Sequence, residues 1–554
     1  MIGAPVTLYQ ALLNTEQTYG AQEAFVCQGE RLTWSQTLAG TRRIAAALHA
    51  RGIRKGDHVG IKMGNGATWL QAFFACAAIG AVTVPVNTRF KTDELAFCLK
   101  QADVKLLVFV DSFLGIDFVD LLKAVEPAFD TRLPGQALPE LAYAVMAGDG
   151  KAPAAAQRYA DFLAAGDAAQ VDVDALAEQV TPDDILLMQF TSGTTSFPKG
   201  VMLTHANMVT NAWAAGQRIG VRSDDRYFSI RPFFHVSGTT LSVLVSLVYG
   251  CCLLTLPKFD VAETLRILDE ERCTLTSGND TIFLMMMGHP DFDRNKLHLR
   301  GGWAAAGPEV MQQIQDVMGV PNVCNAYGQS EASPNVVLSD RNDAFELRAA
   351  GWGLPHEGTQ VRIADADTGV EPPRGERGEI QVKGWHVMRG YYKMPEATAK
   401  AFTADGWLKT GDLGEMSQDG RIRMVGRLKD MYRVGGENVA PAEVEETLHA
   451  HPAVQQAQVI GVPDARLGEV TAAFVLLKAG KTASSQELID WCKGRCANFK
   501  VPRYLEVVDT FENIGMTGSS KVQKNKLRDH AIVLFGLGSG GRDDRRHIVR
   551  VLRP

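Results

Sequence analysis

The chain has 554 residues, of which 46% are hydrophobic, and is therefore long enough for two to four domains with large cores. Its 57 basic and 63 acidic residues give a net charge of −6 at pH 7, which argues against a nucleic-acid-binding surface. The nine cysteines include no Cys-x-x-Cys pair, and Cys492 and Cys496 lack an adjacent histidine to complete a zinc site. No basic residue precedes Arg31, so the charged start of a secretory signal is missing, and we expect a protein of the reducing cytoplasm.

Helical and strand patterns alternate along the first part of the chain, which is typical of a layered α/β fold. Alanine-rich segments at 44–49 and 69–79 predict helices, and the apolar runs at 81–86, 107–110 and 185–188 predict buried strands. Residues 127–178, rich in Ala, Gly, Pro and Asp, read as a variable surface insertion.

The third of these strands leads into a loop rich in hydroxyl groups. Residues 191–200 read Thr-Ser-Gly-Thr-Thr-Ser-Phe-Pro-Lys-Gly. Four hydroxyls, the backbone N–H groups near Gly193 and the ammonium of Lys199 can all donate to anionic oxygens. We therefore expect this loop to bind the phosphates of a nucleotide triphosphate.

The loop has two other interpretations. A Walker A loop needs a second glycine where Pro198 stands and a metal-binding hydroxyl where Gly200 stands, so the loop does not fit that motif. A Ser/Thr-rich surface turn between a strand and a helix is the other alternative for this segment taken alone.

Residues 239–256 contain no charged residue over 18 positions, which approaches the length of a membrane span. The segment also contains Gly250 and five Ser or Thr residues, and its end at 251–256 reads as a buried strand following a helix. We expect no transmembrane segment.

After predicted strands at 360–365 and 378–383, the pattern changes from Lys429 onward to a compact α+β unit. Its predicted elements are helices at 442–449 and 485–495 and strands at 454–462, 469–477 and 504–508. The chain ends with an apolar run at 531–535, a match to Gly-x-Gly-x-x-Gly and five arginines. Too few residues remain to complete a dinucleotide-binding βαβ unit, so we expect a basic, flexible tail.

Four further motifs follow the loop in order. They are Tyr-Gly-Gln-Ser-Glu at 327–331, Lys-Thr-Gly-Asp at 409–412, Gly-Arg-Leu-Lys-Asp at 426–430 continuing into Gly-Gly-Glu-Asn-Val-Ala-Pro-Ala-Glu-Val-Glu at 435–445, and Thr-Gly-Ser-Ser-Lys-Val-Gln-Lys at 517–524. Together with the 191–200 loop, they resemble the motifs of the adenylate-forming superfamily of acyl-CoA synthetases, luciferases and peptide-synthetase adenylation domains. The loop departs from the family pattern at Ser196, where the family has glycine.

The resemblance implies an α/β fold with a large multi-subdomain N-terminal domain of layered sheets and a small mobile α+β C-terminal domain. The expected boundaries are 1–426 for the AMP-binding and acyl-binding domain, 427–429 for a hinge centred on Lys429, 430–530 for a lid domain with the catalytic lysine, and 531–554 for the tail. In the family, the small domain rotates at this hinge between two poses, so that one lysine serves the first reaction and leaves before the second.

The resemblance also implies roles for individual residues. Tyr327 would lie beside adenine, Ser330 would meet the α-phosphate, Glu331 would hold Mg²⁺, and Asp412 would accept from the ribose hydroxyls. The predicted catalytic residues are Lys521, Glu331, His235 and Thr191. The predicted ATP- and CoA-binding residues are Thr191, Ser192, Gly193, Thr194, Thr195, Lys199, Gly307, Tyr327, Gly328, Ser330, Asp412, Arg427, Arg433, Gly435, Gly436, Asn438 and Lys521.

The acyl pocket is expected between Arg-Pro-Phe-Phe-His-Val-Ser-Gly at 231–238, similar to the family's Pro-x-Phe-His, and Gly-Gly-Trp-Ala-Ala-Ala-Gly-Pro at 301–308. The expected substrate contacts are Phe234, His235, Trp303, Ala305, Ala306 and Gly328. His235 could instead be a hydrogen-bonded core histidine, and Trp303 either a pocket wall or a core plug. Neither segment offers a cation placed to bind a second carboxylate, so we favour an apolar acid over a dicarboxylate such as malonate.

The resulting prediction is an ATP-dependent carboxylic acid:CoA ligase that uses Mg²⁺ and acts on an aryl acid such as a hydroxycinnamate or on a medium-chain fatty acid. Two alternatives stay open. One is an adenylation enzyme that loads a carrier protein. The other is a catalytically inactive acyl-binding member, because Ser520 replaces the usual glycine before the catalytic lysine. The expected partners are small molecules without nucleic acid, and the sequence is compatible with a homodimer.

Overall fold

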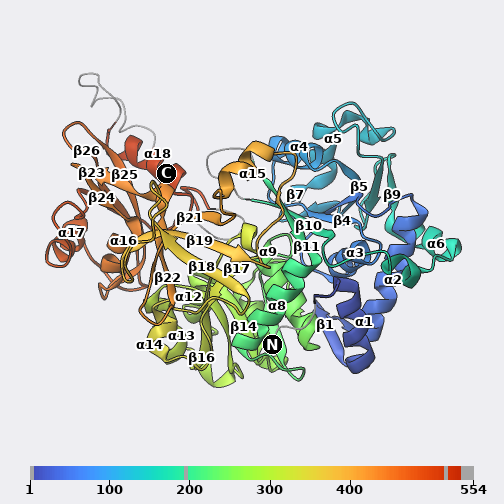
Figure 1. The fold of residues 1–554 in the computed structure, drawn as a ribbon, viewed down its shortest axis with the longest axis horizontal. Coiled ribbons are helices and arrows are strands. Elements are labelled where there is room, and N and C mark those ends of the chain that lie inside the picture. The colour runs from blue at the N-terminus through green and yellow to red at the C-terminus, as the bar shows by residue number, and fades with distance from the viewer. Residues whose placement is uncertain (1–4, 192–197, 517–521, 538–554) are drawn as a thin grey trace. The chain divides into compact units, whose positions relative to one another are not determined.

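The computed structural model describes residues 5–191, 198–516 and 522–537 (Figure 1). The chain divides into two compact units, Met1–Met424 and Val425–Pro554. The larger unit contains two eight-stranded sheets and most of a four-stranded sheet, and the smaller unit contains one five-stranded sheet with helices.

The first eight-stranded sheet, called here the loop sheet, carries the hydroxyl-rich loop. In spatial order its strands are β20 (Gly390–Tyr391), β11 (Gly200–Thr204), β10 (Ile185–Phe190), β4 (Val82–Pro85), β3 (His58–Lys62), β5 (Val104–Phe109), β8 (Tyr143–Met146) and β9 (Ala156–Arg158). The strands from β10 to β9 run parallel, whereas β11 and β20 are antiparallel to their neighbours. A parallel sheet needs helical crossovers and is covered on both faces.

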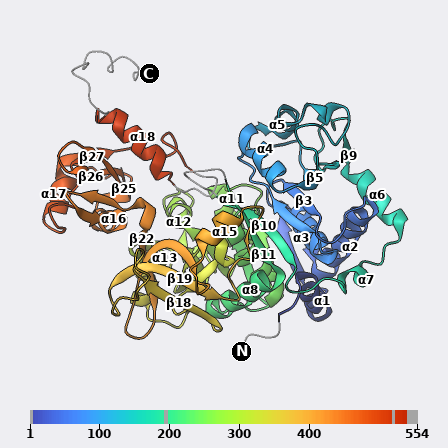
Figure 2. The same ribbon diagram turned by 45° about the horizontal axis from the view of Figure 1, so that its top comes forward.

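Helices cover both faces of the loop sheet. In Figure 2, α4 (Thr92–Gln101) and α5 (Phe118–Val125) lie on one side of β3 and β5, and α2 (Trp34–Ala50) and α3 (Ala67–Ala78) lie on the other. The strands serve two cores: along β5, Leu106 and Val108 belong to one hydrophobic cluster, and Leu107 and Phe109 belong to the other. Burial on both faces is why these strands are continuous apolar runs in the sequence.

The second eight-stranded sheet, called here the acyl sheet, has the order β17 (Asn335–Leu338), β16 (Asn322–Gly328), β15 (Gly301–Ala305), β14 (Leu275–Asn279), β12 (Arg226–Ser229), β13 (Cys252–Thr255), β1 (Glu23–Cys27) and β2 (Glu30–Thr33). The six central strands are parallel, and the two edge strands are antiparallel. The carboxyl ends of the six strands therefore meet along one edge of the sheet.

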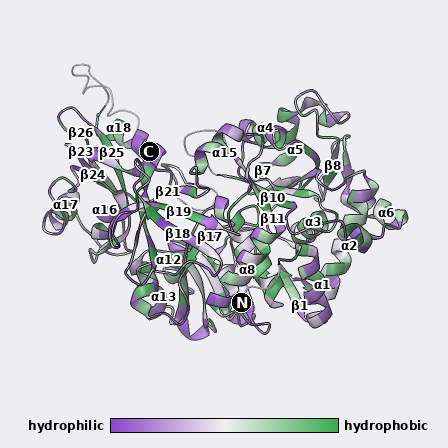
Figure 3. Cartoon of the chain, in the orientation of Figure 1, coloured by the Kyte–Doolittle hydropathy of each residue, from purple (hydrophilic) through white to green (hydrophobic). Residues whose placement is uncertain are grey.

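The remaining helices of the larger unit are α1 (Leu8–Tyr19), α6 (Tyr159–Ala169), α7 (Val173–Ala177), α8 (His205–Ile219), α9 (Val236–Gly238), α10 (Val245–Tyr249), α11 (Val261–Glu270), α12 (Asp280–Met287), α13 (Pro308–Asp316), α14 (Phe345–Ala349) and α15 (Pro395–Ala401), with a π-helix at Thr239–Leu244. Helices such as α2 and α13 carry both hydrophobic and hydrophilic positions, as expected for helices that pack one face on a sheet (Figure 3). Helix α8 starts with a capping box in which Thr204 and Asn207 hydrogen-bond each other's backbone N–H groups.

An antiparallel sheet follows, made of β18 (Thr359–Ala364), β19 (Arg377–Gly384), β21 (Leu408–Met416) and β22 (Ile422–Arg427). The smaller unit has the strand order β24 (Glu437–Val439), β23 (Tyr432–Val434), β26 (Gly468–Leu477) and β25 (Val454–Asp464), with β27 (Tyr504–Val507) also paired to β26. Its helices are α16 (Pro441–His449), α17 (Ser485–Lys493) and α18 (Lys524–Leu534).

The predicted α/β fold class is confirmed, and so are the predicted strands and helices of the smaller unit. The predicted strand at the end of 239–256 is also confirmed, because β13 follows the π-helix and α10. Within the described residues, every helix is too short or too polar to cross a bilayer.

Two expectations were wrong. The segment at 127–178 is not a surface insertion, because β8 and β9 complete the loop sheet and Phe162 of α6 is fully buried. The apolar run at 531–535 is not the start of the tail. It continues helix α18 across the predicted boundary at 530, with Ala531 buried and Phe535 packed against the same core. At 127–178 composition misled because small and polar residues can still fill close helix and strand contacts, and at 531–535 it misled because the Gly- and Arg-rich residues that follow drew the apolar run into the tail.

Candidate active site

Hydrogen bonds join the two ends of the hydroxyl-rich loop, where β10 ends and β11 begins. Thr191 N donates to Lys199 O at 3.1 Å, and Lys199 N donates to Thr191 Oγ1 at 3.2 Å. The antiparallel pairing of Phe190 with Gly200 brings the two ends together. The predicted binding residues Ser192, Gly193, Thr194 and Thr195 lie outside the described residues.

Lys199 and Glu331 converge on Tyr391. The Lys199 ammonium lies 4.8 Å from the centre of the Tyr391 ring, and the Tyr391 hydroxyl donates to Glu331 Oε1 at 2.9 Å. Burial, together with the nearby Glu331 carboxylate, raises the pKa of Tyr391. The tyrosine is held there because β20 pairs with β11 and because Met388 N donates to Glu331 O at 2.9 Å.

Sequence reasoning missed Tyr391. The only sequence signal at this position is a pair of tyrosines after Arg389-Gly390, which by itself points to no chemistry. The pairing of a two-residue strand with β11, almost 190 residues earlier in the chain, gives the tyrosine its position.

Tyr327 and Asp412 are in direct contact. The Tyr327 hydroxyl donates to Asp412 Oδ2 at 2.8 Å, and Asp412 is 6% exposed. The Asp412 backbone is fixed by Thr410, whose Oγ1 accepts from Asp412 N at 3.1 Å and donates to Ile380 O at 2.6 Å. Two motifs that are 85 residues apart therefore present one aromatic ring and one carboxylate at the same place.

The turns after β15 and β16 lie at the carboxyl edge of the acyl sheet, where open α/β sheets bind ligands. Gly307 N donates to Asp280 Oδ1 at 3.0 Å, and Asn325 Nδ2 donates to Ala306 O at 2.8 Å. Ala305, at the end of β15, is exposed. A Cβ on Gly328 would come within 2.0 Å of Pro334 O, so only glycine fits this close approach. Ser330 begins a short 3-10 helix that also carries Glu331.

His235 is half-buried at the start of α9, with Phe234 buried beside it. Its Nδ1 lies 2.8 Å from Ser237 Oγ. The preceding loop follows β12 of the acyl sheet and is held to the loop sheet by two amides: Gln189 at the end of β10 donates to Phe234 O at 3.1 Å, and Asn65, which follows β3, accepts from Phe233 N at 2.8 Å. Sequence reasoning found His235 but missed these two amides, which fix its position.

Arg231 lies in the same loop and is buried. Sequence reasoning did not assign this cation to the acyl pocket. Trp303 is 2% exposed and its Nε1 donates to the Tyr227 hydroxyl at 2.7 Å, which fits the core-plug alternative. Tyr227 in turn donates to Leu241 O at 2.9 Å.

In the smaller unit, Arg433 is an exposed residue of β23, and Gly435 and Gly436 form the two-residue turn between β23 and β24. Their φ angles of +59° and +96° are those of a type I′ hairpin turn, which favours glycine. Arg427 ends β22, and Lys429 is exposed within a 3-10 helix at Leu428–Asp430. The Asn438 side chain and all of Lys521 lie outside the described residues, although Met516 and Val522, which flank the Lys521 segment, pair in a β-bridge.

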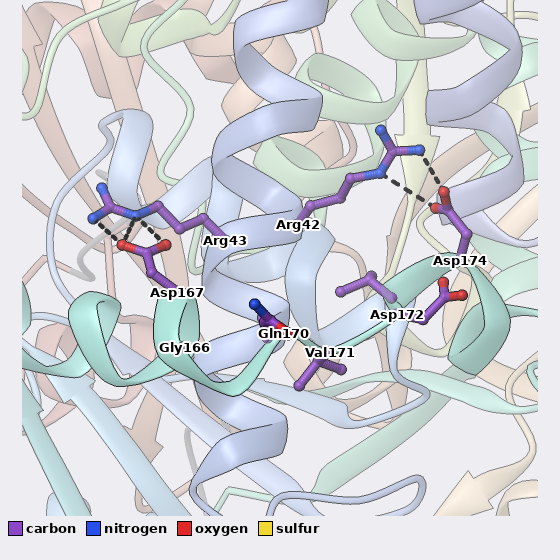
Figure 4. Close-up of a pocket in the computed structure, with 10 residues that line it drawn as sticks. Arg42, Arg43, Gly166, Asp167, Gln170, Val171, Asp172 and Asp174 are labelled. Carbon is purple, nitrogen blue, oxygen red and sulfur yellow. Dashed lines mark hydrogen bonds and ion pairs between the residues drawn. The ribbon is translucent and has the colours of Figure 1, made fainter.

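A surface pocket of about 520 Å³ lies away from every predicted site residue (Figure 4). It is lined by Arg42, Arg43, Ala46, Gly166, Asp167, Gln170, Val171, Asp172, Val173 and Asp174. Its two arginines are already paired with aspartates of α6 and α7, as the dashed lines in Figure 4 show. Both arginines are therefore neutralised, and the third lining carboxylate, Asp172, caps α7 by accepting from Ala175 N at 3.0 Å.

Within the described part of the chain, no group of three or more His, Cys, Asp or Glu side chains could hold a metal ion by itself. Glu331 alone suits Mg²⁺ in a different way, because Mg²⁺ usually takes one or two carboxylates and completes its shell with substrate phosphates and water. Its carboxylate and the Lys199 ammonium both contact Tyr391, one at the hydroxyl and the other at the ring.

The comparisons with known proteins agree with this geometry. A model of AMP-binding enzymes matches residues 13–392, and a model of their C-terminal domain matches residues 443–521. The chain belongs to the AMP-binding enzyme family.

Relatives within the family are similar along nearly the whole chain. The putative acyl-CoA synthetase YngI of Bacillus subtilis is 40% identical over 96% of this chain and 98% of its own length. The mitochondrial medium-chain acyl-CoA ligase ACSF2 of Danio rerio is 34% identical over 96% and 89%. The crystal structure of ATP-bound MatB from Rhodopseudomonas palustris is 28% identical, with a TM-score of 0.83, over 95% of this chain and 99% of that one. The chain is accordingly an AMP-forming acid-thiol ligase of the acyl-CoA synthetase type.

Proposed function

We propose that this AMP-binding enzyme joins an apolar monocarboxylic acid, either a medium-chain fatty acid or an aryl acid such as a hydroxycinnamate, to coenzyme A at the expense of ATP. The observation that carries the proposal is the convergence of four motif residues in the larger unit. Lys199 and Glu331 meet at Tyr391, and Tyr327 donates to Asp412. A cation, an aromatic ring and two carboxylates suit the phosphates, base, ribose and counter-ion of a nucleotide.

The first half-reaction would form an acyl-adenylate. A carboxylate oxygen of the acid attacks the α-phosphorus of ATP, the bond to the bridging oxygen breaks, and pyrophosphate leaves with the electron pair. Because an anion approaches a polyanion, positive charge is needed at the phosphate oxygens. Lys199 and Lys521 would supply it, with Thr191 and Ser330 as hydroxyl donors. Mg²⁺ held at Glu331 would neutralise further phosphate charge when bound.

The second half-reaction would transfer the acyl group to sulfur. The thiol of coenzyme A attacks the carbonyl carbon of the mixed anhydride, loses its proton, and displaces AMP. Arg433, Gly435, Gly436 and Asn438 of the smaller unit are the proposed coenzyme A contacts, and Lys429 is the proposed hinge that exchanges Lys521 for them between the two steps. These roles rest on the resemblance of the 426–445 and 517–524 motifs to those of the family.

The choice of acid rests on the apolar side chains of 231–238 and on the small residues of 301–308. The name of the 34% identical relative, a medium-chain acyl-CoA ligase, supports the fatty-acid alternative. All nine cysteines are free, and eight of them are buried, which supports the proposal of a reducing cytoplasmic compartment.

A screen of pyrophosphate release over a panel of carboxylic acids, with and without coenzyme A, tests the proposal. We expect release with apolar monocarboxylates and thioester formation when coenzyme A is present. Release without thioester would instead favour an enzyme that loads a carrier protein, and no release with any acid would favour an inactive acyl-binding protein.

Lys521→Ala tests the assignment of the catalytic cation. We expect adenylation to fall by about 10² to 10³, the scale for removing one preorganised charge-stabilising donor, because Lys521 would stabilise the adenylation transition state. Thioester formation from supplied acyl-adenylate should change little. A variant that adenylates at the wild-type rate would show that another group supplies this charge.

A further inference from the structure

Arg231 is a buried cation in an unusual environment. The residue is 5% exposed, and its Nε and Nη2 both donate to one acceptor, Ser237 Oγ, at 3.2 Å. The guanidinium carbon lies 5.8 Å from the centre of the Trp303 ring. Among the described residues no carboxylate forms an ion pair with Arg231, and burial lowers its pKa to about 10. A buried charge that lacks a counter-charge is strongly unfavourable, so such a group is normally paired.

Another buried arginine shows how a purely structural guanidinium is satisfied in this protein. Arg348 is equally 5% exposed, yet it donates to three backbone carbonyls, those of Asp343, Val323 and Pro321. These bonds tie α14 to β16 and use donors on three nitrogens. Arg231 instead shares a single hydroxyl between two of its nitrogens, so donor capacity is left over.

The polar groups nearest to Arg231 in the sheet do not supply the missing acceptor. Ser229, Ser242 and Ser277 bond to one another, at 2.7 Å between Ser229 and Ser242 and 2.9 Å between Ser277 and Ser229. From Arg231, Ser229 Oγ accepts the backbone N–H, at 3.3 Å, whereas the guanidinium donates to Ser237 Oγ. These hydroxyls are neutral and already engaged.

The position of Arg231 is fixed and close to His235. Asn65 donates to Arg231 O at 3.1 Å and accepts from Phe233 N, which holds the loop on both sides of Pro232. Ser237 Oγ, the acceptor of the guanidinium, also lies 2.8 Å from His235 Nδ1. The cation is therefore one hydroxyl away from His235, one of the predicted substrate contacts.

We propose that Arg231 donates to a ketone or hydroxyl oxygen on the acyl body of the substrate, so that among monocarboxylic acids the enzyme selects those that carry such an oxygen over plain hydrocarbon acids. This inference rests on the proposed function, because the inference requires that the substrate acid binds with its acyl group beside His235. A donor built to bond a substrate oxygen discriminates against the analogue that lacks the oxygen, because the buried donor is then left without an acceptor.

Matched acids test the proposal. Adenylation is measured as pyrophosphate release for octanoate, for the same chain ending in a methyl ketone or a carboxylate, and for cinnamate with and without a para-hydroxyl. Each acid is assayed with the wild type, Arg231→Met and Arg231→Lys. Arg348→Met is the control for loss of a buried structural arginine.

We expect the wild type to prefer the ketone-bearing or hydroxyl-bearing member of at least one series by about 10- to 100-fold in kcat/KM, the range for a hydrogen bond to a charged group. Arg231→Met should bring the ratio close to one, mainly through KM, and Arg231→Lys should restore part of it. The melting temperature of Arg231→Met should stay equal or rise, because an uncompensated buried charge is removed, whereas that of Arg348→Met should fall.

Preference for the ketone or the phenol supports the proposal. Preference confined to the dicarboxylate would overturn it, because the cation would then pair with a second carboxylate instead of a neutral oxygen. A wild type that prefers plain acids in both series, or an Arg231→Met variant that keeps the wild-type ratios, would overturn it while leaving the ligase function standing. Absence of pyrophosphate release with every acid would instead contradict the proposed function itself.

Discussion

Buried charges are paired differently at the two ends of the parallel strands of the acyl sheet, called here the amino edge and the carboxyl edge. At the amino edge, Asp225 is 1% exposed and accepts from Arg300 Nε at 2.9 Å, from Thr274 Oγ1 at 2.7 Å and from Arg222 N at 2.7 Å. At the carboxyl edge, Arg231 has a single hydroxyl as acceptor. The strands are parallel, so each edge gathers like ends, and ligands of open α/β sheets bind at the carboxyl ends.

This difference separates charges that hold the fold from a charge available to a ligand. The amino edge also carries a second ion-pair group, in which Arg31 and Arg226 both contact Glu23 and Glu271. The Arg31 and Arg226 hydrogen bonds lower the pKa of Glu23 to about 2. Complete pairing at one edge and incomplete pairing at the other indicate that stability and function occupy opposite ends of the same strands.

The largest effect is expected from breaking the amino edge. Asp225→Ala leaves Arg300 without its carboxylate and removes the acceptor of Arg222 N and Thr274. Loss of one partner of a buried pair costs about 3–5 kcal/mol of unfolding free energy. Denaturant unfolding measures this loss. Asp224→Ala, which removes the neighbouring carboxylate with its side chain 73% exposed, is the matched control and should change the unfolding midpoint little. Equal effects of the two variants would contradict the distinction.

A buried group can also avoid an unpaired charge by staying neutral, as His386 does. It is fully buried, neither ring nitrogen has a hydrogen-bond partner among the described residues, and burial lowers its pKa to about 4. Between the ordinary pKa of about 6.5 and the folded value, only the unfolded chain binds the proton. Stability is therefore complete above pH 6.5 and declines as the pH falls towards 4.

His386→Leu should remove this contribution. The wild type should lose up to about 3 kcal/mol through this residue between pH 7 and pH 4, and the variant should have a shallower dependence by about one proton. Unfolding free energies at several pH values measure the slope. The control is His289→Leu, because His289 is only partly buried and its side chain lies near the exposed Asp291. An unchanged slope in His386→Leu would show that the folded protein protonates His386.

The smallest effect is expected at the pocket of Figure 4, where charges are paired but exposed. The Arg43 and Asp167 side chains are each 49% exposed, and water screens their attraction. Asp167→Asn should leave the melting temperature and adenylation close to those of the wild type. Calorimetry and the pyrophosphate assay check this outcome, and a clear loss of activity would give the pocket a function that its geometry does not suggest.

Much of the fold could be read from the sequence because its strands are continuous apolar runs and its smaller unit alternates clearly between periods. The runs at 107–110 and 185–188 became β5 and β10, and those at 454–462 and 469–477 became β25 and β26. The segment at 127–178 was misread because composition does not show whether small residues face solvent or fit a close contact. The run at 531–535 was misread because its neighbours in sequence, and not the core that it packs on, decided the boundary.

The sequence by itself determined the family and the residue types that meet a nucleotide, since the motifs at 191–200, 327–331 and 409–412 are local and specific. Only the tertiary structure decided which of them touch. The Tyr327 contact with Asp412 and the place of Tyr391 between Lys199 and Glu331 depend on strand pairing across long sequence separations. The tertiary structure also showed that Arg231 is buried with no carboxylate partner in the part of the chain that the structure describes, because the burial and pairing of a charge depend on every element packed around it.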